Sequence, residues 1–206
     1  MRAIVIAGGT ISAPAFFRSY VREDDLIVCA DSGYLHCEKM GLVPDLVIGD
    51  FDSCRRDAIP ESVPVKTLPV EKDETDLHTC IHYAIEQGAG EILVFGGRGS
   101  RLDHSLAAIS LVYMGLMQGV SIRLIDEHNE LFMFQDEVEI PRKEGYKLSL
   151  LPVTPATGID AQGLYYPLED SAMDWGNPYG VSNEFVSDVA KIRVKSGVLM
   201  AILSRD

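Results

Sequence analysis

The sequence has no long apolar run, no paired cysteine spacing and few basic residues. No stretch approaches the roughly 20 apolar residues that a membrane-spanning helix needs, and the short N-terminal run ends in Gly8-Gly9, which indicates a first strand and not a signal peptide. Its four cysteines show no CxxC spacing, which argues against a zinc site or a disulfide framework and indicates a cytoplasmic protein. With 31 acidic against 18 basic residues and a net charge of −13, nucleic-acid binding is not expected.

Strand and helix patterns alternate along the chain up to about residue 126. Short β-branched, apolar runs occur at 3–7, 26–30, 45–48, 65–68, 91–95 and 120–125. Helix patterns lie between them, near 13–22, 33–41, 74–88 and 103–118. This alternation predicts an α/β domain with a mostly parallel sheet that is covered by helices on both faces.

The pattern changes after Asp126, where strong helical stretches end. Short strand patterns at 132–134, 146–151, 190–194 and 198–203 are separated by glycine and proline. Such a pattern is typical of a small antiparallel sandwich. We therefore expect two domains, an α/β domain over residues 1–126 and an all-β sandwich over residues 127–206.

Aspartates that follow strand-like runs in the first half of the chain are the clearest indication of function. They are Asp31, Asp50, Asp52, Asp73, Asp76 and Asp103. The ends of parallel strands form the ligand crevice of an open α/β sheet. Carboxylates gathered there repel one another unless a cation lies between them, and hard oxygen ligands favour Mg²⁺. The pattern predicts a magnesium–polyphosphate site, with turn-forming aspartates as the simpler alternative for each residue alone.

The third helix pattern opens with Lys72-Asp73-Glu74-Thr75-Asp76. Acidic residues at a helix start commonly satisfy free backbone N–H groups and the helix dipole, and on these residues alone plain capping is the favoured interpretation. The functional alternative is that the free N–H groups, Lys72 and Thr75 face phosphates while Asp76 holds a metal.

A glycine-rich loop, Gly96-Gly97-Arg98-Gly99-Ser100-Arg101, joins a strand pattern to the fourth helix pattern. Glycines let the backbone approach a phosphate closely, and arginine supplies charge and directed donors. The spacing matches neither the Walker-type phosphate loop nor the dinucleotide fingerprint. Gly8-Gly9-Thr10 is a weaker signal that a tight turn would explain, and His104 at a helix start is interpreted as structural.

One polar segment stands out in the second half, Gly180-Val181-Ser182-Asn183-Glu184. Locally it predicts only a turn between strands. The nearby aromatic residues Tyr165, Tyr166 and Trp175 are typical of core or rim packing. A flat cationic heterocycle would also use such a ring as a stacking face.

Taken together and in this order, the segments resemble the thiamine pyrophosphokinase family. The matching segments are Ala30-Asp31-Ser32-Gly33, the run from Pro44 to Ser53, Lys72-Asp73-Glu74-Thr75-Asp76, Arg101-Leu102-Asp103-His104 and Gly180-Val181-Ser182-Asn183-Glu184. The resemblance extends over almost the whole chain, and five modest motifs in register make it specific. Two positions depart from the family's pattern, because Ala107-Ala108 and Tyr179 stand where asparagine and arginine are frequent.

The resemblance implies an enzyme that moves the β,γ-pyrophosphoryl group of ATP onto the hydroxyl of thiamine and releases AMP. It also implies Mg²⁺, an α/β domain that binds ATP, a β-sandwich that binds thiamine, and a homodimer with active sites at the subunit interface. By position, the metal ligands are Asp50, Asp52 and Asp76, and the nucleotide contacts are Asp31, Ser53, Thr75 and Arg101. The same resemblance implies catalytic roles for Lys72, Asp73, Arg101 and Asp103. It implies thiamine contacts for Ser182 and Asn183, with Tyr166 or Trp175 as the stacking ring.

Two questions stay open at this point. No residue is an obligatory general base, since either Asp73 or Asp103 could accept the hydroxyl proton. Two other functions also remain: a pyrophosphokinase for another alcohol, such as a hydroxymethylpterin, and a non-catalytic nucleotide or thiamine sensor. The full set of carboxylates argues against a sensor, because a protein that only binds has no need for so many metal ligands.

Overall fold

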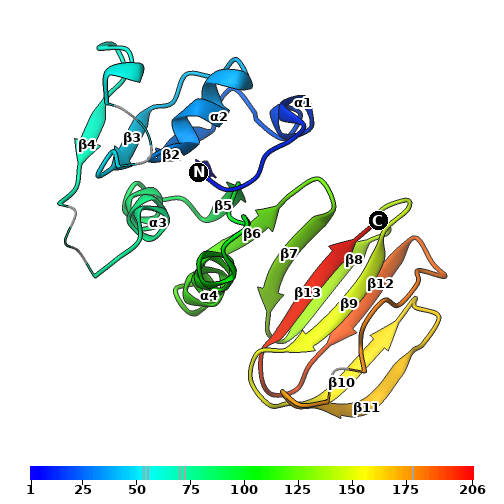
Figure 1. The fold of residues 1–206 in the computed structure, drawn as a ribbon. Coiled ribbons are helices and arrows are strands. Elements are labelled where there is room, and N and C mark those ends of the chain that lie inside the picture. Colours follow the sequence, from blue (N-terminus) through cyan, green and yellow to red (C-terminus); the bar gives the residue numbers. More distant parts are fainter. Residues whose placement is uncertain (53, 55, 70, 72, 178) are drawn as a thin grey trace. The chain divides into compact units, whose positions relative to one another are not determined.

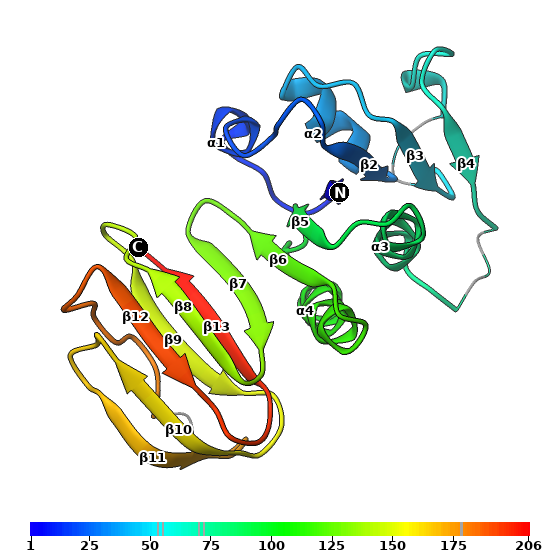
Figure 2. The same ribbon diagram turned by 180° about the vertical axis from the view of Figure 1, so that it is seen from behind.

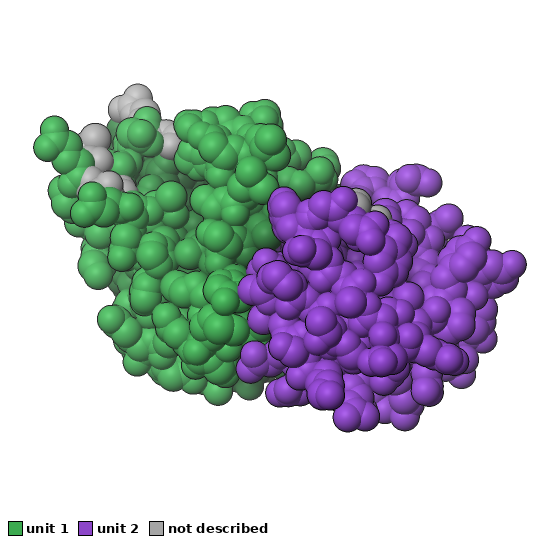
Figure 3. Space-filling view, turned by 90° about the horizontal axis from the view of Figure 1, so that it is seen from below, with its two compact units in different colours: residues 1–127 green, residues 128–206 purple. Residues whose placement is uncertain are grey.

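The computed structural model describes residues 1–206 apart from 53, 55, 70, 72 and 178, and it divides into two units, Met1–Glu127 and His128–Asp206. Figure 3 shows each unit as a separately coloured body. The described part of the chain contains no helix that is both long and apolar enough to cross a membrane.

The first unit is an α/β domain, as the sequence predicts. Its parallel sheet has the strand order β4-β3-β2-β1-β5-β6. Figures 1 and 2 show α1 and α2 on one face of this sheet and α3 and α4 on the other. The elements are β1 (Arg2–Ile6), α1 (Pro14–Arg18), β2 (Leu26–Ala30), α2 (Gly33–Lys39), β3 (Leu46–Gly49), the 3₁₀ turn η1 (Arg56–Ala58), β4 (Val65–Thr67), α3 (Asp76–Glu86), β5 (Glu91–Phe95), α4 (Leu102–Met117) and β6 (Ser121–Ile125).

The strands of this sheet are mostly apolar, because helices cover both faces and bury most of the side chains on each. Ile4, Ile6 and Phe95 have no solvent exposure and pack with Phe17 of α1 and other side chains in one buried cluster. At roughly 25 cal/mol per Å² of apolar surface, this burial is the main stabilising contribution to the unit. It holds the carboxyl ends of the strands in fixed positions, and those ends carry the candidate site.

Helix α3 illustrates how the local sequence sets an element. Thr75 caps its start, with Oγ1 accepting a hydrogen bond of 3.2 Å from the backbone N–H of His78. One side of the helix buries Cys80, Ile81 and Ala84. Gly88 follows at a φ of 90°, a conformation that glycine adopts at little cost just past a helix end. The helix is therefore slightly shorter than the 74–88 that periodicity predicts.

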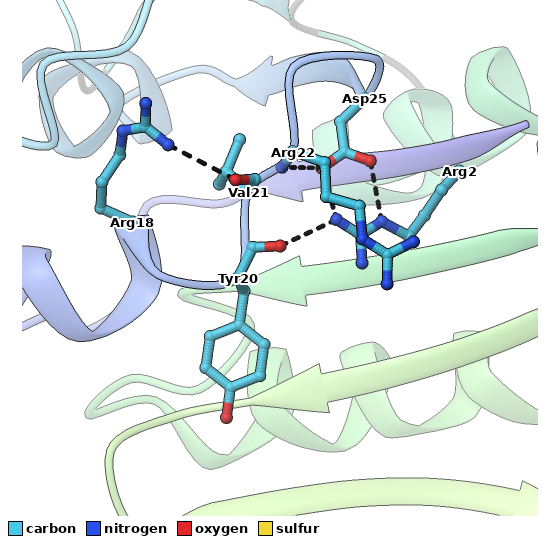
Figure 4. A network of polar contacts seen from close by, with 6 residues as sticks. All are labelled: Arg2, Arg18, Tyr20, Val21, Arg22 and Asp25. Atoms are coloured by element: carbon cyan, nitrogen blue, oxygen red, sulfur yellow. Dashed lines mark hydrogen bonds and ion pairs between the residues drawn. The ribbon is translucent and has the colours of Figure 1, made fainter.

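A buried ion pair joins the amino end of β1 to the turn before β2 (Figure 4). Arg2 donates from Nε and Nη2 to the two carboxylate oxygens of Asp25, both at 2.7 Å, and Nη2 also donates to the carbonyl of Tyr20 at 2.8 Å. The backbone N–H of Arg22 donates to the same carboxylate at 2.7 Å. Arg18 lies beside this group and donates to the carbonyl of Val21 at 3.5 Å. Burial raises the pKa of Asp25, but the hydrogen bonds from Arg2 and Arg22 outweigh it and lower the pKa overall.

The second unit is all-β and antiparallel, as the sequence predicts. Strand β13 pairs with β7 and β9, and a four-stranded sheet has the order β11-β10-β12-β8. Leu148, Ile159, Ile192 and Leu199 have no solvent exposure in its core. The strands are β7 (Asn129–Phe134), β8 (Glu137–Pro141), β9 (Lys147–Pro152), β10 (Ala156–Gln162), β11 (Leu168–Met173), β12 (Val189–Arg193) and β13 (Leu199–Ser204).

Candidate active site

A pocket of about 570 Å³ lies in the first unit, at the carboxyl ends of its strands. Strand β1 pairs with β2 on one side and with β5 on the other, so the chain leaves β1 and β5 toward opposite edges of the sheet. A crevice at such a switch point is the usual ligand site of an open α/β sheet. The pocket is lined by loop and helix-start residues: Ala7, Gly8, Gly9, Thr10, Ala30, Asp31, Ser32, Asp50, Asp52, Thr75, Asp76, Leu77, Gly96, Gly97, Gly99, Ser100, Arg101, His104, Ala107 and Ala108.

Two glycine loops run side by side along this pocket: Gly8-Gly9-Thr10, which follows β1, and residues 96–99, which follow β5. Beyond the strand ends, the N–H of Gly9 donates to the carbonyl of Gly96 at 2.9 Å and that of Thr10 to the carbonyl of Arg98 at 2.8 Å. A Cβ on Gly9 would collide with both of these carbonyl oxygens. The contact therefore requires glycine at position 9, and the tight turn expected from Gly8-Gly9-Thr10 is part of the pocket wall.

His36 of α2 holds the first of these loops. Its Nε2 lies 2.8 Å from the carbonyl oxygen of Gly9. Burial lowers the pKa of the imidazole, so the ring is neutral at physiological pH and its Nε2–H donates this bond. The bond fixes the loop from the side of α2, and the sequence alone gave no indication of it.

Three carboxylates converge at the ends of β2 and β3. Asp31, Asp50 and Asp52 each offer an oxygen, and these oxygens all lie within 4.8 Å of one another. Asp31 is only 5% exposed. Like charges this close repel one another, most strongly at the buried carboxylate of Asp31, and a hard dication such as Mg²⁺ would offset the repulsion. The donor set therefore fits Mg²⁺.

The backbone around these carboxylates is unusual. Asp31 has a φ of 44° and Phe51 a φ of 60°, both in the left-handed region that side chains rarely adopt. A Cβ on Gly49 would lie 2.9 Å from the Cβ of Asp31, so only glycine lets the end of β3 come this close. Phe51 packs against the core cluster of the unit. Core packing thus compensates for backbone strain and turns the flanking aspartates toward the pocket.

Only some of the remaining predicted residues of the first unit line the pocket. Thr75, Asp76 and Arg101 line it. Asp76 is outside the group of three close carboxylates, whereas Asp31, expected at the nucleotide, is inside it. Asp73 and Asp103 are not among the described residues that line the pocket. Ser53 and Lys72 lie outside the described residues.

Arg101 and Asp103 form an exposed ion pair at the start of α4. Nη2 of Arg101 lies 2.6 Å from Oδ2 of Asp103, and the backbone N–H of His104 donates to Oδ1 of Asp103 at 2.9 Å. The bond from Arg101, with that from His104, lowers the pKa of Asp103 to about 2. A carboxylate with so low a pKa is a weak proton acceptor.

In the second unit, Asn183 fastens a segment that carries an exposed aromatic ring. Its Nδ2 donates to the carbonyl of Tyr166 at 2.7 Å, and its Oδ1 accepts from the N–H of Tyr166 at 3.0 Å. Asn183 is 9% exposed, whereas Tyr166 is 67% and Trp175 76% exposed. Ser182 has a φ of 59° and its N–H donates to Oγ of Ser149 at 3.0 Å. The structure thus brings Asn183 and Tyr166 together, with both aromatic rings open to solvent.

Some pocket residues were not predicted as functional. Gly8, Gly9 and His104 line the pocket, and so do Ala107 and Ala108, which depart from the family's pattern. A signal existed for the first two, because a glycine pair directly after the first strand of an α/β domain lies at the carboxyl edge of the sheet. For His104 the local sequence offers no comparable indication, whereas the two alanines stand where the family often has asparagine.

Comparisons with known proteins cover both units. Residues 17–124 match the family model described as thiamin pyrophosphokinase, catalytic domain, and residues 136–199 match the one described as thiamin pyrophosphokinase, vitamin B1 binding domain. The thiamine pyrophosphokinase of Bacillus subtilis is 31% identical over 209 residues, with 98% of each chain covered. Its crystal structure aligns with a TM-score of 0.92 at 29% identity and covers 100% of both chains. The structure of the Geobacillus thermodenitrificans protein aligns with a TM-score of 0.89 at 27% identity, covering 100% of this chain and 98% of that one.

Proposed function

This chain belongs to the thiamine pyrophosphokinase family, and we propose that its two units bind different substrates. The first unit binds ATP and Mg²⁺, and the second binds thiamine. The enzyme is an ATP:thiamine diphosphotransferase. The reaction joins the thiamine hydroxyl to the β-phosphorus of ATP, breaks the bond between the α,β-bridging oxygen and that phosphorus, and releases AMP. The main observation in support of ATP and Mg²⁺ binding by the first unit is that three carboxylates and two glycine loops line one pocket.

The experiment that tests this function measures AMP formed from ATP in the presence and absence of thiamine. We expect AMP and thiamine diphosphate to appear together in equal amounts and only when thiamine is added. AMP release that depends on a hydroxymethylpterin instead would indicate the other pyrophosphokinase. Binding of ATP and thiamine without AMP formation would indicate a sensor.

We assign Mg²⁺ to Asp31, Asp50 and Asp52, with Asp76 on the same pocket wall. When bound, the ion would offset charge on the transferring phosphoryl oxygens. The aspartates hold that position because the ends of β2 and β3 are fixed by the core. Pyrophosphoryl transfer needs positioning and charge stabilisation more than covalent help from the protein.

We assign the phosphates of ATP to the glycine loops and to the start of α3. The start of this 11-residue helix lines the pocket with Thr75, Asp76 and Leu77, and a helix N-terminus favours phosphate oxygens. Arg101 lines the pocket and adds a positive charge with directed donors. Because Asp103 is held ionised by Arg101 with a pKa of about 2, it suits orienting Arg101 better than accepting a proton. Asp73 is then the remaining candidate to accept the proton of the thiamine hydroxyl.

Stacking of thiamine on an exposed ring of the second unit gives a first prediction. Tyr166→Ala should raise the Michaelis constant for thiamine by the equivalent of about 0.5–2 kcal/mol, because the cationic thiazolium loses its aromatic face. The constant for ATP should stay unchanged. Trp175→Ala is the matched variant and should have the smaller effect, since Asn183 holds only the Tyr166 segment. Unchanged thiamine constants in both variants would rule out stacking on either ring.

A second prediction concerns assembly. We propose a homodimer in which each active site takes phosphate contacts from one chain and thiamine contacts from the other. Asp52→Asn chains lack a proposed metal ligand, and Asn183→Ala chains lose a proposed direct contact with thiamine as well as both bonds that hold Tyr166, so each variant alone should be inactive. Mixed and reassociated in equal amounts, they should recover about a quarter of wild-type activity, because half of the dimers are mixed and each mixed dimer has one intact site. Mixed dimers that form but stay inactive would place each site within one chain.

A cytoplasmic location is also proposed. All four cysteines are buried and none forms a disulfide, which suits a compartment that keeps thiols reduced.

A further inference from the structure

Helix α3 carries a second group of potential metal ligands, distinct in chemistry from the carboxylates of the pocket. Glu74, His78 and His82 each offer one ligand atom, and these atoms all lie within 4.8 Å of one another. Nδ1 of His78 lies 3.8 Å from Oε2 of Glu74. The rings of His78 and His82 have centroids 4.6 Å apart. None of the three lines the pocket, as far as the described residues show.

The spacing along the helix explains why these groups meet. His78 and His82 are four residues apart, which in an α-helix means a rise of about 6 Å and a rotation of about 40°. Glu74 precedes the cap residue Thr75, so its side chain can reach back along the same side of the helix. Asp76 is turned away from His78 by about 160° around the helix axis, so the two groups face different surroundings.

We propose that Glu74, His78 and His82 bind a divalent transition ion of the zinc class. Two imidazole nitrogens and one carboxylate oxygen are a ligand set that zinc accepts in tetrahedral sites, with water in the fourth position. The same nitrogen ligands select against Mg²⁺, which prefers an all-oxygen shell. All three side chains are partly exposed, so small rotamer changes can bring the ligand atoms from the present separation to coordination distance.

The ion would act as a clamp on the start of α3. Glu74 lies before the cap, while His78 and His82 lie in the first two turns. One ion bound to all three ties the segment ahead of the helix to the helix itself, and any ligand that binds only the folded state stabilises it. Thr75 and Asp76, which line the pocket, lie within the clamped segment. The proposal does not depend on the phosphate chemistry of that pocket.

Calorimetric titration of zinc chloride into the untagged protein in excess Mg²⁺ tests the proposal. We expect one zinc ion per chain, and affinity reduced by roughly 10- to 100-fold or more in His82→Ala and in Glu74→Gln. Glu61→Gln is the control, because it removes an exposed carboxylate of the first unit that is outside the group and away from α3; its affinity should be unchanged. Asp52→Asn should also bind zinc like the wild type, which separates this site from the magnesium site.

Imidazole resonances give a second, direct readout. The chain has five histidines, and in a nitrogen-15 spectrum zinc should shift those of His78 and His82 and leave the other three in place. Wild-type affinity in both His82→Ala and Glu74→Gln, or an equal loss in Glu61→Gln, would overturn the proposal. So would a zinc-induced shift confined to histidines outside the group.

Discussion

Asp52→Asn should lower the rate of pyrophosphoryl transfer by about three orders of magnitude, because the variant lacks a ligand of the Mg²⁺ proposed above, and that ion would supply several kcal/mol of charge stabilisation. The substitution removes one charge from the group formed with Asp31 and Asp50 while keeping the size of the side chain. Turnover is measured as AMP formed at saturating ATP, thiamine and Mg²⁺. Circular dichroism should show an unchanged fold, since Asp52 is exposed and outside the core.

Asp57→Asn is the matched control for this result. Asp57 is an exposed aspartate in η1, five residues further along the chain, and it does not line the pocket. Its activity should stay near that of the wild type. Near-normal turnover of Asp52→Asn at saturating Mg²⁺ would remove Asp52 from the metal site, and equal losses in both variants would indicate a general effect of surface charge.

Asp25→Asn should destabilise the first unit by about 3–5 kcal/mol, the usual cost of removing one partner from a buried ion pair. The side chain of Asp25 is 1% exposed and that of Arg2 12%. Without the carboxylate, the guanidinium is buried with a neutral amide in place of its counter-charge. Denaturant unfolding measures the change, which should appear in the transition of the first unit. Asp24→Asn, at the exposed neighbouring position, should change stability by less than about 0.5 kcal/mol.

The same ion pair sets a dependence on pH. Its hydrogen bonds lower the pKa of Asp25 in the folded state below that of the unfolded chain. The stabilisation is therefore complete above the unfolded value of about 3.9 and is lost as pH falls through the folded value. Asp25→Asn should show a flatter stability curve than the wild type in this acidic range. An identical slope in the two proteins would contradict this assignment.

Much of the fold could be predicted because its signals are local. The parallel strands are buried on both faces and appear as continuous apolar runs, while capping and periodicity mark α3. Strands β8, β10 and β11 were not predicted. In β10, Gly158 has a φ of 62° and the pairing register shifts between Ala156 and Ile159 and again before Ala161, so polar and apolar residues do not alternate. Glu and Pro in β8, and Glu and Asp in β11, also have low strand propensity.

The site was less predictable than the fold because its contacts join distant segments. Asp50 and Asp52 are two residues apart, and the family resemblance assigned both to the metal. The sequence did not indicate that Asp31 belongs to the close group and Asp76 does not, because the position of Asp31 depends on the pairing of β2 with β3 and on the close approach that Gly49 permits. The bond from His36 to Gly9 likewise spans 27 positions. The pairing of Asn183 with Tyr166 also depends on tertiary structure.

The central place of β1 has a consequence for synthesis on the ribosome. Residues 3–6 can pair with β2 as soon as residues 26–29 have emerged, but the other edge pairs with residues 91–95, which are translated much later. Until then the nascent chain presents an apolar, unpaired edge, which is the kind of surface that chaperones bind and that aggregates form on. The second glycine loop follows β5 directly, so the pocket proposed for ATP is completed in the same stretch of translation that pairs this edge of β1. A ribosome-bound chain that ends before β5 should therefore be sensitive to protease and unable to retain ATP.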